Sequence, residues 1–258
     1  MRSICRVCAI SLVLFLGMFL MFSCDKASEK PAAEKAGKKI VVATDATWPP
    51  MEMVDQNKNI VGYDIDFMNA VAKEGGFAVE FKNTAWDGIF GGLDLGKYDA
   101  VISSVTITDE RKKTFDFSTP YINAGQVLVV QNALVVTTLG DMKGKTVGAQ
   151  IGTTGAMEVK KVEGVELKSY DEIGLAFEDM AAGRIFGVVC DTPVAADYAL
   201  QRAEYKEKFK IVGEPFTEES YGIVLKKGNK ELQDLINTGI ASVQKKGIDK
   251  ELEKKWLR

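Results

Sequence analysis

Histidine is absent from all 258 residues of the chain. Its imidazole is a frequent general base, titrates near neutral pH and is the commonest metal ligand in proteins. The absence excludes catalytic triads that contain histidine, histidine general bases and zinc sites of the histidine-containing kind. Any catalytic or binding chemistry must therefore come from other side chains.

Cysteine is also scarce. Three of the four cysteines, Cys5, Cys8 and Cys24, lie in the first 24 residues, which leaves Cys190 alone in the rest of the chain. A single cysteine cannot form a bridge within its own domain. We expect a fold without disulfides, in which Cys190 either lines a site or is a small buried side chain.

Sequence motifs for nucleotide binding are missing as well. The stretch from Gly91 to Tyr98 has the spacing of a P-loop, but Tyr98 occupies the place of the Ser or Thr that would hold Mg²⁺. No GxGxxG or GxSxG occurs. With 33 basic and 36 acidic residues, the chain also lacks the basic excess that attracts nucleic acid. We predict neither a cofactor nor a nucleic-acid partner.

Long apolar runs are limited to one, from Ala9 to Phe22, which follows Arg2 and Arg6. It is shorter than the roughly 20 residues of a membrane-spanning helix and is typical of an export signal. The Ser23-Cys24 pair at its end resembles a lipobox, although ordinary signal cleavage is an alternative. We predict a signal peptide over residues 1–23 and, over residues 24–39, a polar tether attached to the membrane by a lipid on Cys24.

From residue 40 onward, strand-like and helix-like segments alternate. Strands are expected over residues 40–44, 77–81, 99–105, 146–150 and 185–190, a long β-rich segment over 121–131, and helices after most of them. The chain ends in two amphipathic helices separated at Gly247. This alternation predicts α/β architecture with parallel pairing, and its repetition favours two lobes over one long sheet.

Arg111 lies in the charged stretch TDERKK and has two interpretations. Charge runs are usually solvated faces. The hydroxyl residues Ser103, Ser104 and Thr106, however, stand at the end of the strand that leads to it, where open α/β sheets place ligands. A guanidinium there can hold a carboxylate through two parallel hydrogen bonds. Spacing alone leaves both interpretations open.

Asp191, Trp48 and Trp86 also admit a structural and a functional interpretation. Asp191 follows an apolar strand and precedes Thr-Pro, so it could cap a helix, bind an ammonium group, or do both. The two tryptophans sit in turn-like settings after strands. They could belong to the core or hold a flat or cationic group between their faces.

Six segments together resemble a known family: ATDATWPPME, GYDIDFMNAVAKE, AWDGIFGGL, GKYDAVISSVTITDERKKTFDFSTPY, GKTVGAQIGTT and GRIFGVVCDTP. They are similar to the polar amino-acid family of extracellular solute-binding proteins of ABC importers. The resemblance implies a two-lobed type II periplasmic-binding-protein-like fold. Each lobe is then a mixed sheet flanked by helices, and two hinge strands lie near residues 123–127 and 214–218. Lobe 1 would comprise residues 40–122 and 219–258, and lobe 2 residues 123–218.

The resemblance also implies roles for individual residues. Arg111 would bind the α-carboxylate of a free amino acid, helped by donors of Ser104 and Thr106. Asp191 would bind the α-ammonium, with the carbonyl of Ser104 assisting, and lobe 2 would add Thr153 and Thr154. Lys112 and Lys113 would be surface residues. The partners implied are an importer permease and its ATPase, with the protein a monomer held outside the cytoplasmic membrane by its lipid anchor.

The ligand side chain would lie between Trp48 and Trp86. Its end would face Asp45, Ser103, Gln150 and also Glu52. Glutamine binders of the family resemble this chain at Asp45 but carry Lys in place of Gln150 and His in place of Cys190. Without that lysine, the Asp45 charge is left for the ligand to balance, which favours arginine or lysine. Glutamine remains an alternative ligand, and a periplasmic dehydratase acting on prephenate-like acids or a ligand sensor for a chemoreceptor remain alternative functions.

Overall fold

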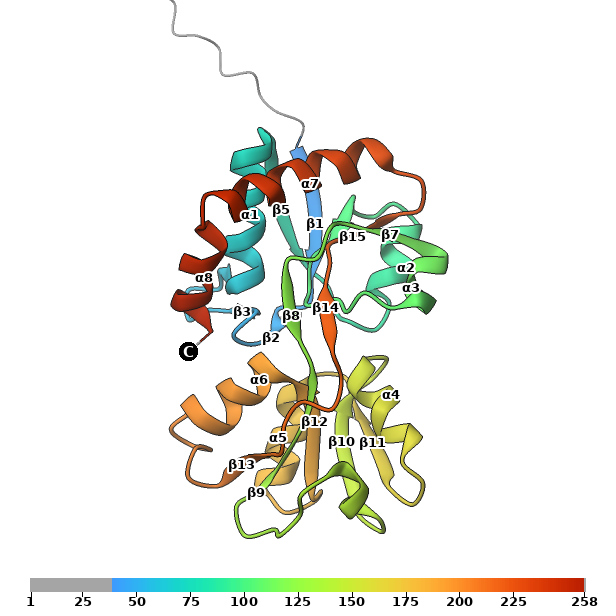
Figure 1. The fold of residues 1–258 in the computed structure, drawn as a ribbon, viewed down its shortest axis with the longest axis vertical. Coiled ribbons are helices and arrows are strands. Elements are labelled where there is room, and N and C mark those ends of the chain that lie inside the picture. Colours follow the sequence, from blue (N-terminus) through green and yellow to red (C-terminus); the bar gives the residue numbers. More distant parts are fainter. Residues whose placement is uncertain (1–38, 258) are drawn as a thin grey trace, which may run out of the picture. The chain divides into compact units, whose positions relative to one another are not determined.

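The structure is a computed structural model that describes residues 39–257. These residues form two α/β lobes, each built on its own five-stranded sheet (Figure 1). Within this range no helix combines the length and the apolar character that crossing a membrane requires. The predicted signal peptide, Cys24 and nearly all of the predicted tether lie outside the described residues.

Lobe 1 is organised around a mixed sheet with strand order β5-β1-β6-β15-β7. Strand β1 pairs in parallel with β5 and β6, while β15 runs antiparallel to its neighbours β6 and β7. The inserted strand β15 comes from the C-terminal part of the chain. The strands are β1 (Lys39–Thr44), β5 (Ala78–Asn83), β6 (Ala100–Val101), β7 (Phe115–Phe117) and β15 (Val224–Lys226).

Helix α1 (Tyr63–Gly75) packs against the C-terminal helices α7 (Lys230–Lys245) and α8 (Ile248–Trp256). The break between α7 and α8 falls at Gly247, as predicted. The approach of α7 to α1 is close, because a Cβ atom at Gly239 would lie 2.4 Å from the carbonyl oxygen of Val71. Lobe 1 also contains short helices α2 (Ile89–Asp94) and α3 (Asp109–Thr114) and a small sheet of β2 (Thr47–Trp48), β3 (Glu52–Val54) and β4 (Ile60–Val61).

Lobe 2 has a second mixed sheet with strand order β11-β10-β12-β9-β13. Strand β9 runs antiparallel to β12 and β13, and the other pairs are parallel. The strands are β9 (Gln126–Gln131), β10 (Thr146–Gln150), β11 (Glu166–Tyr170), β12 (Gly187–Asp191) and β13 (Phe209–Val212). The helical elements are η1 (Leu139–Met142), α4 (Thr154–Lys161), α5 (Ile173–Ala181), α6 (Thr192–Ala196) and the π-helix η2 (Asp197–Gln201).

Two chain segments connect the lobes and run side by side (Figure 1). Strand β8 (Ile122–Ala124) pairs antiparallel with β14 (Glu219–Tyr221). The first predicted hinge segment overlaps β8, whereas the second, over residues 214–218, ends just before β14. At Gly125 a Cβ atom would lie 2.3 Å from the carbonyl oxygen of Thr217. Only glycine permits this contact between the connecting segments.

The strand predicted over residues 99–105 is wrong in its second half, because β6 ends at Val101. The chain then turns at Ser103 and Ser104, and Ser104 has a left-handed φ of 49°. Its N–H donates to the buried Asp64 carboxylate at 2.7 Å, a contact that replaces sheet pairing. Asp64, 40 positions earlier in the chain, therefore ends the strand. The turn at Ser103 and Ser104 forms one wall of the pocket.

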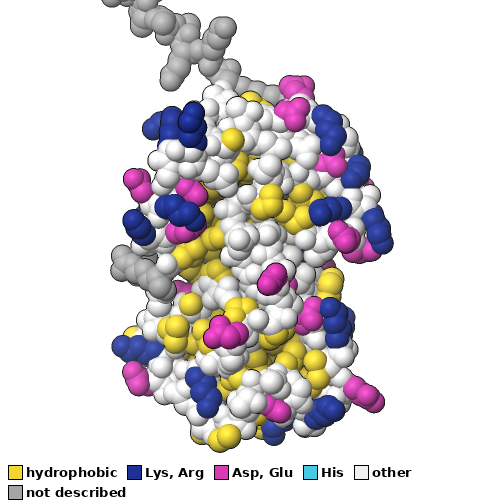
Figure 2. Space-filling model, viewed as in Figure 1, with side chains coloured by type: hydrophobic (Ala, Val, Ile, Leu, Met, Phe, Trp, Pro, Cys, Tyr) yellow, Lys and Arg dark blue, Asp and Glu magenta, His cyan; other side chains and the backbone are white. Residues whose placement is uncertain are grey.

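Basic and acidic side chains are interspersed over the face drawn in Figure 2, with apolar side chains between them. Neither sign of charge gathers into one patch on this face. The distribution agrees with the near balance of charge in the sequence and offers no basic stripe there for a polyanion.

Candidate ligand-binding site

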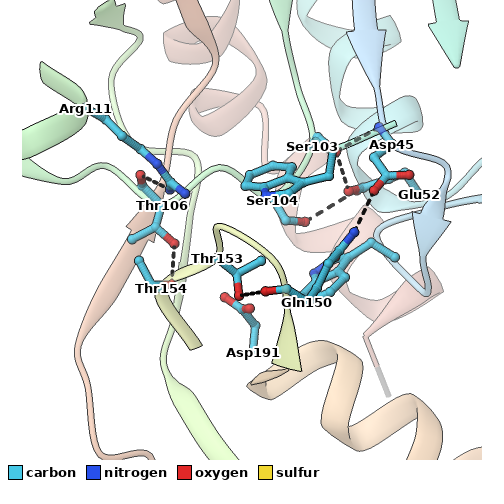
Figure 3. Close-up of a pocket in the computed structure, with 12 residues that line it drawn as sticks. Asp45, Glu52, Ser103, Ser104, Thr106, Arg111, Gln150, Thr153, Thr154 and Asp191 are labelled. Atoms are coloured by element: carbon cyan, nitrogen blue, oxygen red, sulfur yellow. Dashed lines mark hydrogen bonds between the residues drawn. The ribbon is translucent and has the colours of Figure 1, made fainter. Parts of the chain in front are cut away.

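One pocket lies between the lobes and is lined by side chains from both. Its lining contains all eleven residues that the sequence predicted for a ligand site, together with Glu52 (Figure 3). The eleven are Asp45, Trp48, Trp86, Ser103, Ser104, Thr106, Arg111, Gln150, Thr153, Thr154 and Asp191. The structure brings these residues together, and their roles toward a ligand remain a prediction.

Arg111 lies in α3, and it is less exposed to solvent than its neighbours Lys112 and Lys113. Its Nη1 donates to the Thr106 carbonyl at 2.8 Å and its Nη2 to the Gly152 carbonyl of lobe 2 at 3.4 Å. The guanidinium lies 5.5 Å from the ring centre of Trp86, within the range of a cation–π interaction. Burial lowers the pKa of Arg111, and the nearby acidic side chains oppose that shift. A purely solvated charge run is therefore the wrong interpretation for this residue.

Asp191 is the last residue of β12 and occupies the N-cap position of α6. Its side chain makes no capping hydrogen bond and instead accepts from the hydroxyl of Tyr221 at 2.6 Å. Burial raises the pKa of Asp191 to about 7, and the negative charge of Glu219 adds to the shift. The capping interpretation is wrong for the side chain, which is left to line the pocket from lobe 2.

Asp45 lies at the opposite end of the pocket from Arg111 (Figure 3). Its carboxylate accepts from Gln150 Nε2 at 2.9 Å and from the Thr47 hydroxyl at 2.9 Å. The bond to Gln150 joins the two lobes. Burial raises the pKa of Asp45. Within residues 39–257 no basic side chain forms an ion pair with it, so all of its partners there are neutral.

Beneath this end of the pocket lies a second acidic group, the buried pair of Glu52 and Asp64. The Ser103 hydroxyl donates to Glu52 at 2.9 Å, and Tyr121 and the Ser104 N–H donate to Asp64. Burial raises the pKa of both carboxyls, to about 6 for Asp64 and well above the ordinary value for Glu52. The negative charge of Asp64 adds to the shift of Glu52. Asp64 was missed by sequence reasoning because an acidic residue early in a helix reads as a favourable surface charge.

The two tryptophans are buried and also line the pocket, while their role toward a ligand remains a prediction. Trp86 is 8% exposed and packs in an apolar core of lobe 1, whereas Trp48 is 5% exposed and packs in an apolar cluster with residues of both lobes. On the facing side, Thr153 caps α4 by accepting from Ala156 N–H, and Thr154 lies with its hydroxyl 3.5 Å from that of Thr106. Aromatic faces therefore belong to lobe 1, and lobe 2 contributes polar groups.

Other candidate sites receive no support. Cys190 is fully buried outside the pocket lining, and burial raises the pKa of its thiol, so it behaves as a small apolar side chain. The stretch with P-loop spacing begins within α2 and continues into the turn after it, and the Tyr98 hydroxyl donates to the Ile89 carbonyl. In the part of the chain that the structure describes, no cluster of acidic or cysteine side chains could hold a metal ion.

The model of the bacterial extracellular solute-binding proteins, family 3, matches residues 40–258. The chain belongs to this family. This solute-binding protein is 35% identical over 221 residues to the L-cystine-binding protein TcyJ of Escherichia coli K12, a match that covers 84% of this chain and 82% of the relative.

Solved structures agree in fold with this solute-binding protein. An ancestral arginine-binding protein bound to arginine is 43% identical with a TM-score of 0.82, and the match covers 86% of this chain and 100% of the ancestral one. The arginine-, lysine-, histidine-binding protein ArtJ from Geobacillus stearothermophilus is 36% identical with a TM-score of 0.80, covering 85% and 96% of the two chains. The predicted type II two-lobed fold and the predicted family are confirmed.

Proposed function

We propose that the protein captures a free basic amino acid, arginine or lysine, between its lobes and delivers it to an ABC importer. The main support for this proposal comes from Asp45. Its buried carboxylate lies at the end of the pocket away from Arg111, and its hydrogen-bond donors are neutral. The relatives include arginine-binding proteins, which supports the same ligand class.

The charges of the pocket argue for a ligand with an extra positive charge. Arg111 is the one basic side chain in its lining and matches an α-carboxylate, while Asp191 matches an α-ammonium. That leaves the charge of Asp45 to be balanced. An unpaired buried carboxylate is costly, whereas a guanidinium or ammonium at the end of the ligand would satisfy it.

Binding would also close the lobes. Arg111 and Asp45 come from lobe 1, and Asp191 and Gln150 from lobe 2. A ligand that contacts all four has its full set of partners only in the closed form, so it favours closure by its higher affinity for that form. We propose that the importer permease recognises and binds this closed form.

Thermal unfolding of the protein, refolded to remove carried-over ligand, tests the ligand class against each of the twenty amino acids. A ligand at a hundred times its dissociation constant should stabilise the folded state by about 2.7 kcal/mol. We expect the largest rise in melting temperature with arginine or lysine. A larger rise with glutamine would contradict the basic-ligand proposal and leave the amino-acid one standing.

A dehydratase is a second candidate, because Glu52, whose pKa is raised by burial, lines the pocket and could in principle donate a proton. Glu52 is, however, engaged by Ser103, Ser104 and Asp64. We therefore expect binding without turnover. Consumption of prephenate together with no thermal shift from any amino acid would favour the enzyme.

We further propose that Cys24 carries the lipid that holds a monomeric protein outside the cytoplasmic membrane, with domain boundaries as predicted from the sequence. Metabolic labelling with a radioactive fatty acid should mark the protein and fail to mark Cys24→Ala. Release of Cys24→Ala from membranes would accompany that loss. Equal labelling of both forms would refute anchoring at this residue.

A further inference from the structure

A single carboxylate oxygen in the connecting segment receives three hydrogen bonds. Glu219 Oε2, in β14, accepts from the Thr106 hydroxyl at 2.6 Å, the Thr154 hydroxyl at 3.0 Å and Gln126 Nε2 at 3.3 Å. Thr106 belongs to lobe 1, whereas Gln126 and Thr154 open β9 and α4 of lobe 2. The Glu219 side chain therefore joins both lobes at the hinge.

These bonds fix the direction of two hydroxyl groups that line the pocket. A hydroxyl has one proton to donate and two lone pairs that accept. When Thr106 and Thr154 both donate to Glu219, which lies outside the pocket lining, their protons are used there. Thr154 Oγ1 also accepts from Gln126 Nε2 at 3.1 Å, so one lone pair on Thr154 and both on Thr106 remain as acceptors for an ammonium group. A charged acceptor forms stronger bonds of this kind than a neutral one.

Glu219 also contributes negative charge to this end of the pocket. The charged and titratable groups that it faces are Asp191 on β12, Arg111 on α3 and Tyr221 on its own strand. Its charge raises the pKa of Asp191 and supports the protonated form of Arg111. Sequence reasoning missed this residue, because TEES reads as an ordinary polar loop.

We propose that Glu219 is a positioning residue of the ligand site, holding the Thr106 and Thr154 hydroxyls together across the lobes with their lone pairs toward the ligand ammonium. The inference rests on the proposed amino-acid binding function. Since every amino acid has an α-ammonium, Glu219 should affect arginine and lysine equally and leave the choice between them unchanged.

The test compares Glu219→Gln with Glu218→Gln, its exposed neighbour, by calorimetric titration with arginine and with lysine. Hydrogen bonds to a charged group contribute enough that Glu219→Gln should weaken both ligands by about tenfold to a hundredfold. The ratio of the two dissociation constants should stay within about twofold of wild type. Glu218→Gln should bind as wild type does.

The pH dependence of arginine binding is a second measurement, and it distinguishes a positioning role of Glu219 from a merely structural one. Removing the Glu219 charge should lower the pH at which arginine affinity is half lost, because Asp191 then ionises more easily. If Glu219→Gln fails to fold, Thr154→Val provides the test, since it removes one donor and should weaken both ligands in the same proportion.

Three outcomes would overturn the inference. Binding by Glu219→Gln within about twofold of wild type, with an unchanged pH midpoint, would reject Glu219 while leaving the proposed function intact. A loss confined to one ligand would make Glu219 a specificity residue instead. Failure of wild type and Glu218→Gln to bind any amino acid would reject the proposed function, and this inference with it.

Discussion

The charge of Asp191 should make ligand affinity depend on pH. Its pKa is about 7 in the folded protein against 3.8 as the ordinary value, and an ammonium ligand requires the ionised form. Affinity should therefore fall below pH 7, by up to about tenfold per pH unit. Calorimetric titration with arginine between pH 5 and pH 8 measures this dependence, and a constant affinity over that range would contradict it.

The raised pKa of Asp191 has the opposite pH dependence for the stability of the protein without ligand, which should be greater at low pH. A carboxyl whose pKa is raised on folding binds its proton more tightly in the folded state, so its contribution is favourable at low pH. That contribution is lost as pH rises toward 7. We therefore expect the stabilisation by added arginine to be larger at pH 8 than at pH 5.

Arg111 and Lys112 form a matched pair for testing the carboxylate site. Arg111 lines the pocket, and the adjacent Lys112 is exposed. Removing a buried charge partner of a carboxylate leaves that carboxylate unpaired. We expect Arg111→Ala to weaken arginine binding by about a hundredfold or more and Lys112→Ala to leave it nearly unchanged. Equal effects of the two substitutions would indicate general electrostatic attraction.

Asp45 should control the choice between basic and neutral ligands. Asp45→Asn keeps the size of the side chain and removes the charge that an arginine or lysine end would balance. We expect weaker binding of arginine and unchanged or tighter binding of glutamine, measured as a ratio of dissociation constants. A ratio equal to that of wild type would place the ligand side chain away from Asp45.

Pocket-lining residues could be predicted from sequence, because motif resemblance carries positions over one by one. Glu219 and Asp64 could not, because their importance arises from contacts over long sequence separations. Thr106 and Glu219 are 113 positions apart, and Ser104 and Asp64 are 40 apart. No local pattern encodes such pairs, and both carboxylates occur among polar residues that suggest a solvated surface.

At the scale of elements, the contact between α1 and α7 should tolerate no added side chain at Gly239. A Cβ atom there would lie 2.4 Å from the Val71 carbonyl oxygen, so the helices must separate. We expect Gly239→Ala to lower the free energy of unfolding by about 1–3 kcal/mol, measured by urea denaturation.

Gly91 in α2 is the control for this substitution, because nothing lies within 4 Å of a Cβ atom placed there. In open space the change from glycine to alanine favours a helix by up to about 1 kcal/mol. Gly91→Ala should therefore be neutral or stabilising. A loss of stability equal to that of Gly239→Ala would refute the steric explanation.

Periodicity and glycine stops predicted the main helices and strands, including the break at Gly247. The prediction was wrong about the end of β6 and the start of the second connecting strand, and tertiary contacts determine both boundaries. Strand β6 stops at Val101 because Asp64 captures the Ser104 N–H, and the second connecting strand begins at Glu219, where β8 supplies its partner. Propensity says where a strand can form, and the availability of a neighbouring strand decides where it ends.

At the scale of the whole molecule, ligand affinity should depend directly on how readily the two lobes close. Direct bonds already join the lobes, among them those between Gln150 and Asp45 and between Arg111 and the Gly152 carbonyl. Gln150, Asp45 and Arg111 line the pocket, so a ligand acts on the same groups that hold the lobes together. A side chain behind the pocket lining, such as Glu219, should therefore change affinity without touching the ligand.

The position of β15 has a consequence for the order in which the chain can fold. Residues 224–226 fill the place between β6 and β7, so a growing chain has made all of lobe 2 before the sheet of lobe 1 can be completed. Lobe 2 is continuous in sequence and has no such delay. Pulsed hydrogen exchange during refolding should protect the amides of β9, β10 and β12 before those of β6 and β7, and the reverse order would refute this. Until residues 224–226 are synthesised, the chain has an incomplete sheet with unpaired strand edges.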